Sequence, residues 1–76
     1  MKENYVYPAR MEFVDGNYRV RFIDFPDMTC DEKSTKKEVL ESARESLVLE
    51  ILESLDNGEE LPKPTESEED VIYIHI

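Results

Sequence analysis

The chain has 76 residues, with 19 Asp and Glu against 9 Lys and Arg, and a formal net charge of −10. We expect one small domain, because even a domain of about 60 residues buries only about 60% of the surface that its unfolded chain exposes. This length excludes Rossmann folds, barrels and two-lobed enzymes. The shortage of Lys and Arg argues against direct nucleic-acid binding, which depends on cations that neutralise phosphates. The charge favours a basic partner instead.

Cys30 is the single cysteine, so an internal disulfide and a Cys-rich zinc site are both excluded. The N-terminus has no signal-peptide pattern, and no apolar run approaches the roughly 18 residues of a membrane helix. We therefore expect a cytoplasmic protein without a membrane segment or a cofactor. A core this small gains from association, which predicts a homodimer or a higher oligomer.

Residues 5–14 alternate between apolar and other side chains, a period of two that predicts a strand with one face on a core. Pro8 has no N–H to donate, so we expect an edge strand, or a strand that begins after Pro8. Asp15-Gly16 is typical of a tight hairpin turn. A second strand is predicted for residues 17–25, with Arg19 and Arg21 on its outer face.

The next residues are polar, and a short third strand is predicted for residues 28–31. Thr35 and Glu38 have the spacing of a capping box at a helix start. The helix is predicted to run to Asp56, with Gly58 as its left-handed C-terminal cap. The apolar side chains at helical spacing form a core stripe of Leu40, Ala43, Leu47, Ile51 and Leu55.

Val48, Leu49 and Leu52 make the apolar surface of this helix broader than one small sheet needs. Two interpretations remain open. These side chains either pack under the C-terminal segment or form a dimer or partner surface, as exposed apolar patches often do.

The C-terminal part begins with an extended, proline-rich crossing over residues 59–65. Residues 59–70 hold six acids against one lysine, and their local net charge of −5 is half of the net charge of the chain. A final strand over residues 71–76 is apolar on both faces, as in the centre of a sheet. The predicted fold is α+β, a small sheet packed against one amphipathic helix.

The residues give no recognisable active site. Asp24, Asp27, Asp31 and Glu32 flank one loop, and a solvated, turn-capping or partner-facing role is a better interpretation than a metal site, because no glycine supplies a sharp turn. Acidic neighbours favour an inert thiol at Cys30. His75 is interpreted as a packed or edge residue. Arg10, Arg19 and Arg21 form a small basic stripe, for which pairing with Glu12 or with a partner's carboxylates is favoured over phosphate binding.

The order and spacing of several short motifs resemble the HicB-like antitoxin family. The matching residues are Tyr7-Pro8-Ala9, then Gly16 with Tyr18, Val20 and Phe22, then Asp24-Phe25-Pro26, Thr35 with Glu38, Ala43, Glu45 and Leu47, and the crossing from Gly58 to Pro64. The chain departs from the family at Asp27-Met28 and at Glu32-Lys33, where the family often has glycine. The resemblance covers nearly the whole chain.

The resemblance implies a degraded ribonuclease-H-like β-β-β-α-β fold without the nuclease metal site, and a type II toxin–antitoxin role. The expected partner is a HicA-like toxin, a small basic ribonuclease that cleaves mRNA and whose active surface the antitoxin covers. Residues 1–76 correspond to the toxin-neutralising domain, with no DNA-binding domain. Carboxylates of residues 24–32 and 59–70 are expected to meet the toxin, and the partner-binding candidates are Asp24, Phe25, Asp27, Met28, Asp31, Glu32, Leu49 and Leu52.

Two alternative functions stay open at this point. One is a stand-alone, homo-oligomeric domain of the same family without a toxin. The other is a small metal-dependent nuclease that uses Asp24, Asp27 and Asp31. The first hypothesis, a non-enzymatic antitoxin, agrees best with the acidic composition and the missing active site.

Overall fold

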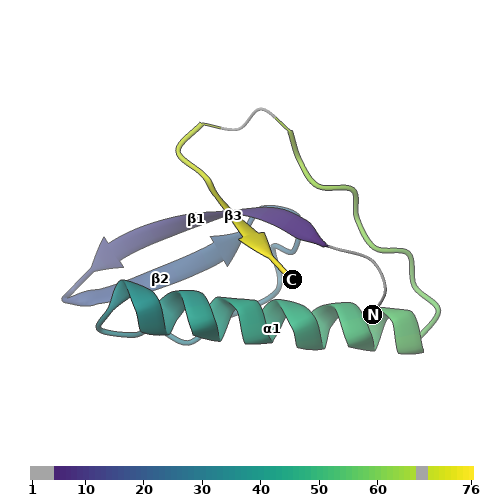
Figure 1. Ribbon diagram of the computed structural model, residues 1–76, viewed down its shortest axis with the longest axis horizontal. Helices are drawn as coiled ribbons and strands as arrows, with labels where there is room; N and C mark the ends of the chain where they lie inside the picture. The colour runs from purple at the N-terminus through teal and green to yellow at the C-terminus, as the bar shows by residue number, and fades with distance from the viewer. Residues whose placement is uncertain (1–4, 67–68) are drawn as a thin grey trace.

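The computed structural model describes residues 5–66 and 69–76, which form a three-stranded antiparallel sheet and one long helix (Figure 1). In chain order the elements are β1 (Val6–Val14), β2 (Asn17–Phe22), α1 (Lys36–Asp56) and β3 (Ile72–His75). The sheet order is β2-β1-β3, and α1 packs along one face of the sheet. The predicted α+β class is confirmed.

The hairpin between β1 and β2 forms as predicted, with Val14 opposite Asn17. Asp15 and Gly16 both have positive φ angles, 52° and 84°, as a type I′ turn requires. Strand β2 ends at Phe22, three residues before the predicted end at Phe25. The hairpin thereby places alternate side chains of both strands on the face that α1 covers.

The predicted places of the first and last strands in the sheet are wrong. β1 is the central strand, although it contains Pro8, and β3 is an edge strand, although both of its faces are apolar. The Pro8 carbonyl accepts a hydrogen bond from the Ile23 N–H at 3.3 Å, just past the last β1–β2 pair, Ala9 with Phe22. In an antiparallel sheet the N–H and C=O of one residue face the same neighbouring strand, so the missing N–H of Pro8 is on the β2 side. It therefore removes no hydrogen bond between β1 and β3.

The predicted short strand over residues 28–31 does not form. Instead, Lys33 makes a single bridge to Tyr18 at the outer edge of β2, with N–H to carbonyl distances of 2.7 and 3.1 Å. The loop from Ile23 to Lys33 therefore folds back along β2 and covers that edge of the sheet.

Both ends of α1 are capped by the predicted residues. The Thr35 hydroxyl accepts from the Glu38 N–H at 3.2 Å and donates to the Glu38 carboxylate at 2.8 Å. At the other end Gly58 has φ 70°, and the Glu59 N–H donates to the Ser54 carbonyl at 2.9 Å, which is a Schellman cap. These local interactions fix the length of the helix.

The core lies between α1 and the covered face of the sheet. Val39, Ala43, Leu47 and Ile51 recur every four residues along the helix and are each 0% exposed. Val39 takes the place predicted for Leu40, which is half-buried, and the predicted stripe residue Leu55 is 48% exposed. The sheet contributes the buried side chains of Tyr7, Ala9, Val20, Phe22 and Ile74, and the loop contributes Phe25.

The segment after α1 crosses the far face of the sheet to reach β3. The Tyr7 hydroxyl donates to the Pro62 carbonyl at 2.7 Å, and the Thr65 N–H donates to the Asp24 carboxylate at 3.0 Å. Further along, Arg10 donates to the Glu69 carbonyl at 3.2 Å. The Tyr7 hydroxyl has a raised pKa, caused first by burial and then by the nearby Asp24 charge. The crossing is thus fastened to the loop and to the central strand.

Candidate partner-binding surface

The outer side of α1 carries a line of acidic and leucine side chains. Residues spaced by three and four lie on one side of a helix, and the buried residues of α1 face the opposite way. Leu49 is 67% exposed and Leu52 is 46% exposed, which is unusual for leucines in a chain with so small a core. We call this line the acidic–leucine ridge, and its members are Glu38, Glu41, Glu45, Leu49 and Leu52.

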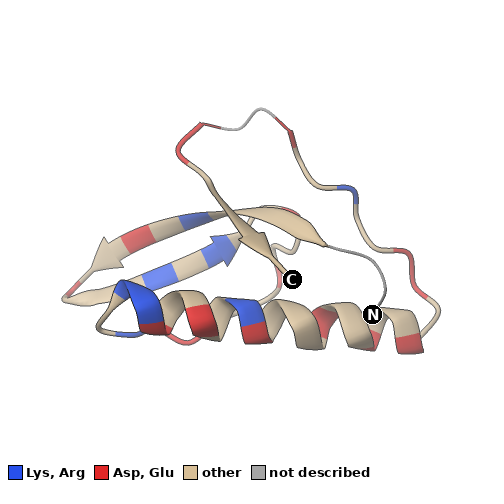
Figure 2. Cartoon of the chain, in the orientation of Figure 1, with Lys and Arg blue, Asp and Glu red and all other residues tan. Residues whose placement is uncertain are grey.

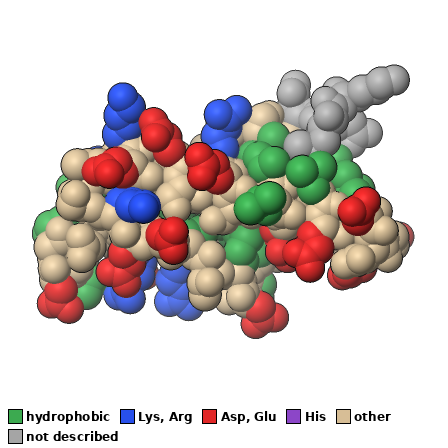
Figure 3. All heavy atoms as spheres, turned by 90° about the horizontal axis from the view of Figure 1, so that it is seen from below, with side chains coloured by type: hydrophobic (Ala, Val, Ile, Leu, Met, Phe, Trp, Pro, Cys, Tyr) green, Lys and Arg blue, Asp and Glu red, His purple; other side chains and the backbone are tan. Residues whose placement is uncertain are grey.

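Figure 3, which views the molecule from the helix side, shows hydrophobic side chains gathered together with acidic side chains on both sides of them. The chemistry of the ridge changes along the helix, because the N-terminal half of α1 carries Lys36, Lys37 and Arg44 and the C-terminal half has no basic residue. Figure 2 shows this separation as blue bands that stop midway along α1. The charged side chains on the half of α1 that carries the exposed leucines are therefore all acidic.

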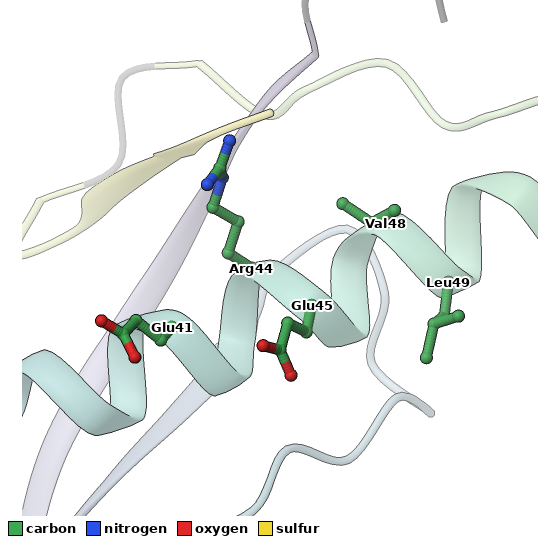
Figure 4. Close-up of a pocket in the computed structure, with 5 residues that line it drawn as sticks. All are labelled: Glu41, Arg44, Glu45, Val48 and Leu49. Carbon is green, nitrogen blue, oxygen red and sulfur yellow. The ribbon is translucent and has the colours of Figure 1, made fainter.

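Two neighbouring grooves join the acidic and apolar parts of the ridge. One has a volume of about 570 Å³ and is lined by Glu41, Arg44, Glu45, Val48 and Leu49. Figure 4 shows Glu41, Glu45 and Leu49 on one side of the helix, whereas Arg44 points toward β3. The second groove shares Glu41 and Glu45 and adds Asp31, Lys33, Glu38 and Ser42. The loop residue Asp31 and the ridge thus form one continuous surface.

Cys30 connects the loop to α1. Its half-buried thiol packs against the core and hydrogen-bonds to the Ser46 side chain on the flank of the helix. Burial raises the pKa of the thiol most, the Ser46 hydrogen bond lowers it, and the Asp31 charge raises it again, with a net rise. The predicted inert character of Cys30 agrees with this direction, since the thiolate is the reactive form.

Two arginines of the basic stripe on the hairpin, Arg10 and Arg19, interact within the chain. Arg19 faces Glu12 across the β1–β2 ladder, with 3.7 Å between their charged atoms. Arg10 donates to the Glu69 carbonyl, as described above. The predicted pairing with Glu12 is confirmed for Arg19 alone, and an exposed ion pair of this kind contributes little stability.

The part of the chain that the structure describes contains no group of three or more His, Cys, Asp or Glu side chains placed to hold a metal ion. Within the same residues no helix is long and apolar enough to cross a bilayer. The His75 side chain is exposed, and its carbonyl accepts from Arg44 Nε at 3.1 Å. Among the surfaces described here, the acidic–leucine ridge is therefore the candidate for binding a partner.

Comparison with known families identifies the chain. The model of the family described as the HicB-like antitoxin of bacterial toxin–antitoxin systems matches residues 6–76. The chain belongs to the HicB-like antitoxin family. Comparison with curated proteins gives no match. Membership gives the chain an antitoxin role in a toxin–antitoxin system, with a toxin as partner, and agrees with a non-enzymatic function.

The residues predicted to contact the partner of this HicB-like chain do not form one surface. Phe25 is 7% exposed and stacks edge-on against Tyr7, with 4.8 Å between ring centroids, so it stabilises the core. Asp24 is half-buried and bonded to Thr65. Met28 packs against the core and lines a separate groove on the far side of the sheet, beside Arg21. Asp27 and Glu32 are exposed in the loop.

Asp31, Leu49 and Leu52 remain as members of one continuous surface of the HicB-like domain. Leu49 and Leu52 are exposed, so the interpretation that they pack under the C-terminal segment is wrong. Sequence reasoning missed Glu41 and Glu45, and it used Glu38 only as a cap. The signal was present, because these acids continue the spacing of the two leucines along the helix.

Proposed function

We propose that this HicB-like chain neutralises a small basic, mRNA-cleaving toxin of the HicA kind, and that the acidic–leucine ridge covers the active, RNA-binding surface of the toxin. The observation that carries the proposal is Leu49, which is 67% exposed on a helix face that it shares with Leu52 and a row of carboxylates. A surface that is apolar at one end and acidic at the other suits a basic protein.

The carboxylates supply the attraction and the orientation. Glu38, Glu41 and Glu45 lie on successive turns of α1, and Asp31 extends their groove from the loop. An RNA-binding surface of a ribonuclease carries cations arranged for phosphates, and a row of carboxylates can occupy the same cations. Such complementarity raises the association rate and the specificity more than the affinity. It also makes binding weaker at high salt.

The leucines supply the stability of the complex. Leu49 and Leu52 are adjacent on the outer side of the helix, and Val48 lines the groove beside them. A few central apolar side chains usually carry most of the binding energy of an interface, and their burial slows dissociation. We propose that the complex acts in the cytoplasm, where the mRNA substrate of such a toxin is found, and that this domain itself does not bind nucleic acid.

The direct test uses the small basic protein encoded by the reading frame adjacent to the gene of this chain. We expect the two proteins to co-purify, and we expect the antitoxin to stop RNA cleavage by the toxin. Leu49→Asp is expected to abolish inhibition. Phe13→Asp introduces the same charge at a 61% exposed apolar residue of the hairpin and is expected to leave inhibition intact. A neighbouring protein that is not small and basic, or the absence of a complex in calorimetry, contradicts the proposal.

A further inference from the structure

The hairpin carries a basic groove on the face of the sheet that α1 does not cover. Arg10 of β1 lies directly opposite Arg21 of β2 in the strand register, and Arg19 lies two residues before Arg21. These arginines alternate along β2 with the buried Val20 and Phe22, so they lie on the face that points away from the helix. Figure 2 shows them as blue bands on both strands of the hairpin. We call this feature the arginine groove, and its lining includes Arg10, Glu12, Arg21, Ile23, Pro26 and Met28.

The arginine pair is unfavourable for the sheet by itself. Like charges directly opposite each other destabilise a pair of strands, and Arg10 and Arg21 are placed in this way. Arg10 is held by the Glu69 carbonyl at 3.2 Å. Arg21 is exposed and makes no hydrogen bond or ion pair with any of the residues that the structure describes. An anion from another molecule, bound to the Arg21 guanidinium, would relieve the repulsion between the two strands.

The nearby carboxylates leave Arg21 to such an anion. Glu12 is the acid in the lining of the groove, and its carboxylate lies 3.7 Å from Arg19. Asp24 is bonded to Thr65, and the exposed Asp27 does not line the groove. The groove has a volume of about 290 Å³, which gives room for side chains of a partner.

The rest of the lining decides between two kinds of anion. Ile23, Pro26 and Met28 supply an apolar surface beside the guanidinium groups, which suits a carboxylate with an apolar neighbour in an acidic peptide. A nucleic acid brings a phosphate at every nucleotide, which a chain with a net charge of −10 repels. It also needs an exposed ring on which a base can stack, and Phe22 in this groove is only 3% exposed.

We propose that the arginine groove binds an acidic peptide segment of a second partner protein. Arg21 pairs with a carboxylate of the peptide, and Pro26 and Met28 contact its apolar neighbour. The groove and the acidic–leucine ridge lie on opposite sides of the molecule, since one is on the uncovered face of the sheet and the other on the outer side of α1. The chain can therefore hold the toxin and the acidic partner at the same time.

Nuclear magnetic resonance of the free chain, labelled at its methionine methyl groups, tests the groove without any toxin. The probe is a synthetic peptide in which leucine and aspartate alternate. We expect the Met28 methyl signal to shift on titration, whereas the signal of Met11, which lines a groove between sheet and helix, stays in place. Arg21→Gln is expected to weaken binding by about tenfold or more, because it removes a charge-assisted hydrogen bond. Lys37→Gln removes the same charge at the exposed start of α1 and is expected to change binding by less than about twofold.

Three further measurements complete the test. The same peptide with lysine in place of aspartate is expected not to bind, and the ridge variant Leu49→Asp is expected to bind the acidic peptide as the wild type does. Far-UV circular dichroism confirms that each variant folds. An unmoved Met28 signal at millimolar peptide, or equal weakening by Arg21→Gln and Lys37→Gln, overturns the proposal. Tighter binding of an oligouridylate than of the peptide assigns the groove to nucleic acid, and self-association that Arg21→Gln abolishes assigns it to a second copy; either result also overturns the proposal.

Discussion

Leu47 and Leu49 lie two residues apart on α1, and their substitution by alanine separates folding from binding. Leu47 is 0% exposed and faces the sheet, whereas Leu49 is 67% exposed on the ridge. A fully buried leucine cut to alanine loses its burial energy and leaves a cavity, which costs about 2–5 kcal/mol. At about 0.05–0.15 kcal/mol per residue, a chain of 76 residues is stable by only about 4–11 kcal/mol. Leu47→Ala therefore removes a large share of the total stability.

Leu49→Ala changes little in the folded domain, because most of the side chain is already in water. We expect a change within about 0.5 kcal/mol, as for other surface substitutions. Urea unfolding followed by far-UV circular dichroism measures both variants in the same buffer. The assignment of the inner and outer sides of α1 is wrong if Leu49→Ala costs as much free energy of unfolding as Leu47→Ala, or if Leu47→Ala leaves the urea midpoint unchanged.

Three further predictions concern the segments that hold the ridge in place. Asp24→Ala removes the acceptor of two Thr65 hydrogen bonds and should lower the free energy of unfolding by about 1.5–3 kcal/mol in urea titrations, whereas an unchanged midpoint contradicts a fastening role. Gly58→Ala places a Cβ in open space at φ 70°, so only backbone strain of about 1–2 kcal/mol should appear, and no loss in thermal melting refutes the left-handed cap. Cys30 has a raised pKa in the folded chain, so folding loses stability as the pH rises from the ordinary thiol pKa through the folded one. Urea midpoints from neutral to alkaline pH should fall less in Cys30→Ser than in the wild type, and iodoacetamide should react slowly with native Cys30 at neutral pH.

Local features of the fold could be predicted because their causes lie within a few residues. Asp15-Gly16 accepts the positive φ angles of the hairpin turn, and Thr35, Glu38 and Gly58 cap the helix through neighbouring backbone groups. These interactions need no knowledge of the rest of the chain. The hairpin turn and both ends of the helix were therefore predicted correctly.

The arrangement of the sheet could not be predicted, because it depends on contacts between distant residues. Pro8 is tolerated in the central strand because β2 ends opposite Ala9. The missing N–H of Pro8 therefore lies just beyond the paired residues of β1 and β2. The apolar residues on both faces of β3 indicated a central strand, yet Ile74 faces the core while Tyr73, on the opposite face, is 49% exposed. Composition alone does not distinguish these cases.

The candidate site was predicted only in part for the same reason. Leu49 and Leu52 were identified from their surplus apolar surface, which helix periodicity reveals. Phe25 was misplaced because a loop phenylalanine beside acids looks exposed in sequence, whereas the ring fills the space next to Tyr7 and Phe22. The contact of the loop with α1, through Cys30 and Ser46, joins distant segments and was not visible in the sequence.

The central claim is that the ridge binds the toxin, and calorimetric titration of the toxin into charge-reversal variants tests it most directly. Glu41→Lys with Glu45→Lys reverses two ridge carboxylates, and Glu59→Lys with Glu60→Lys makes the same change of charge in the exposed start of the crossing segment. We predict that the ridge pair weakens binding by about a hundredfold or more, equivalent to about 2.7 kcal/mol, and that the crossing pair weakens it by less than about tenfold. Equal weakening by both pairs would show that only the net charge matters and would contradict the ridge as the binding surface.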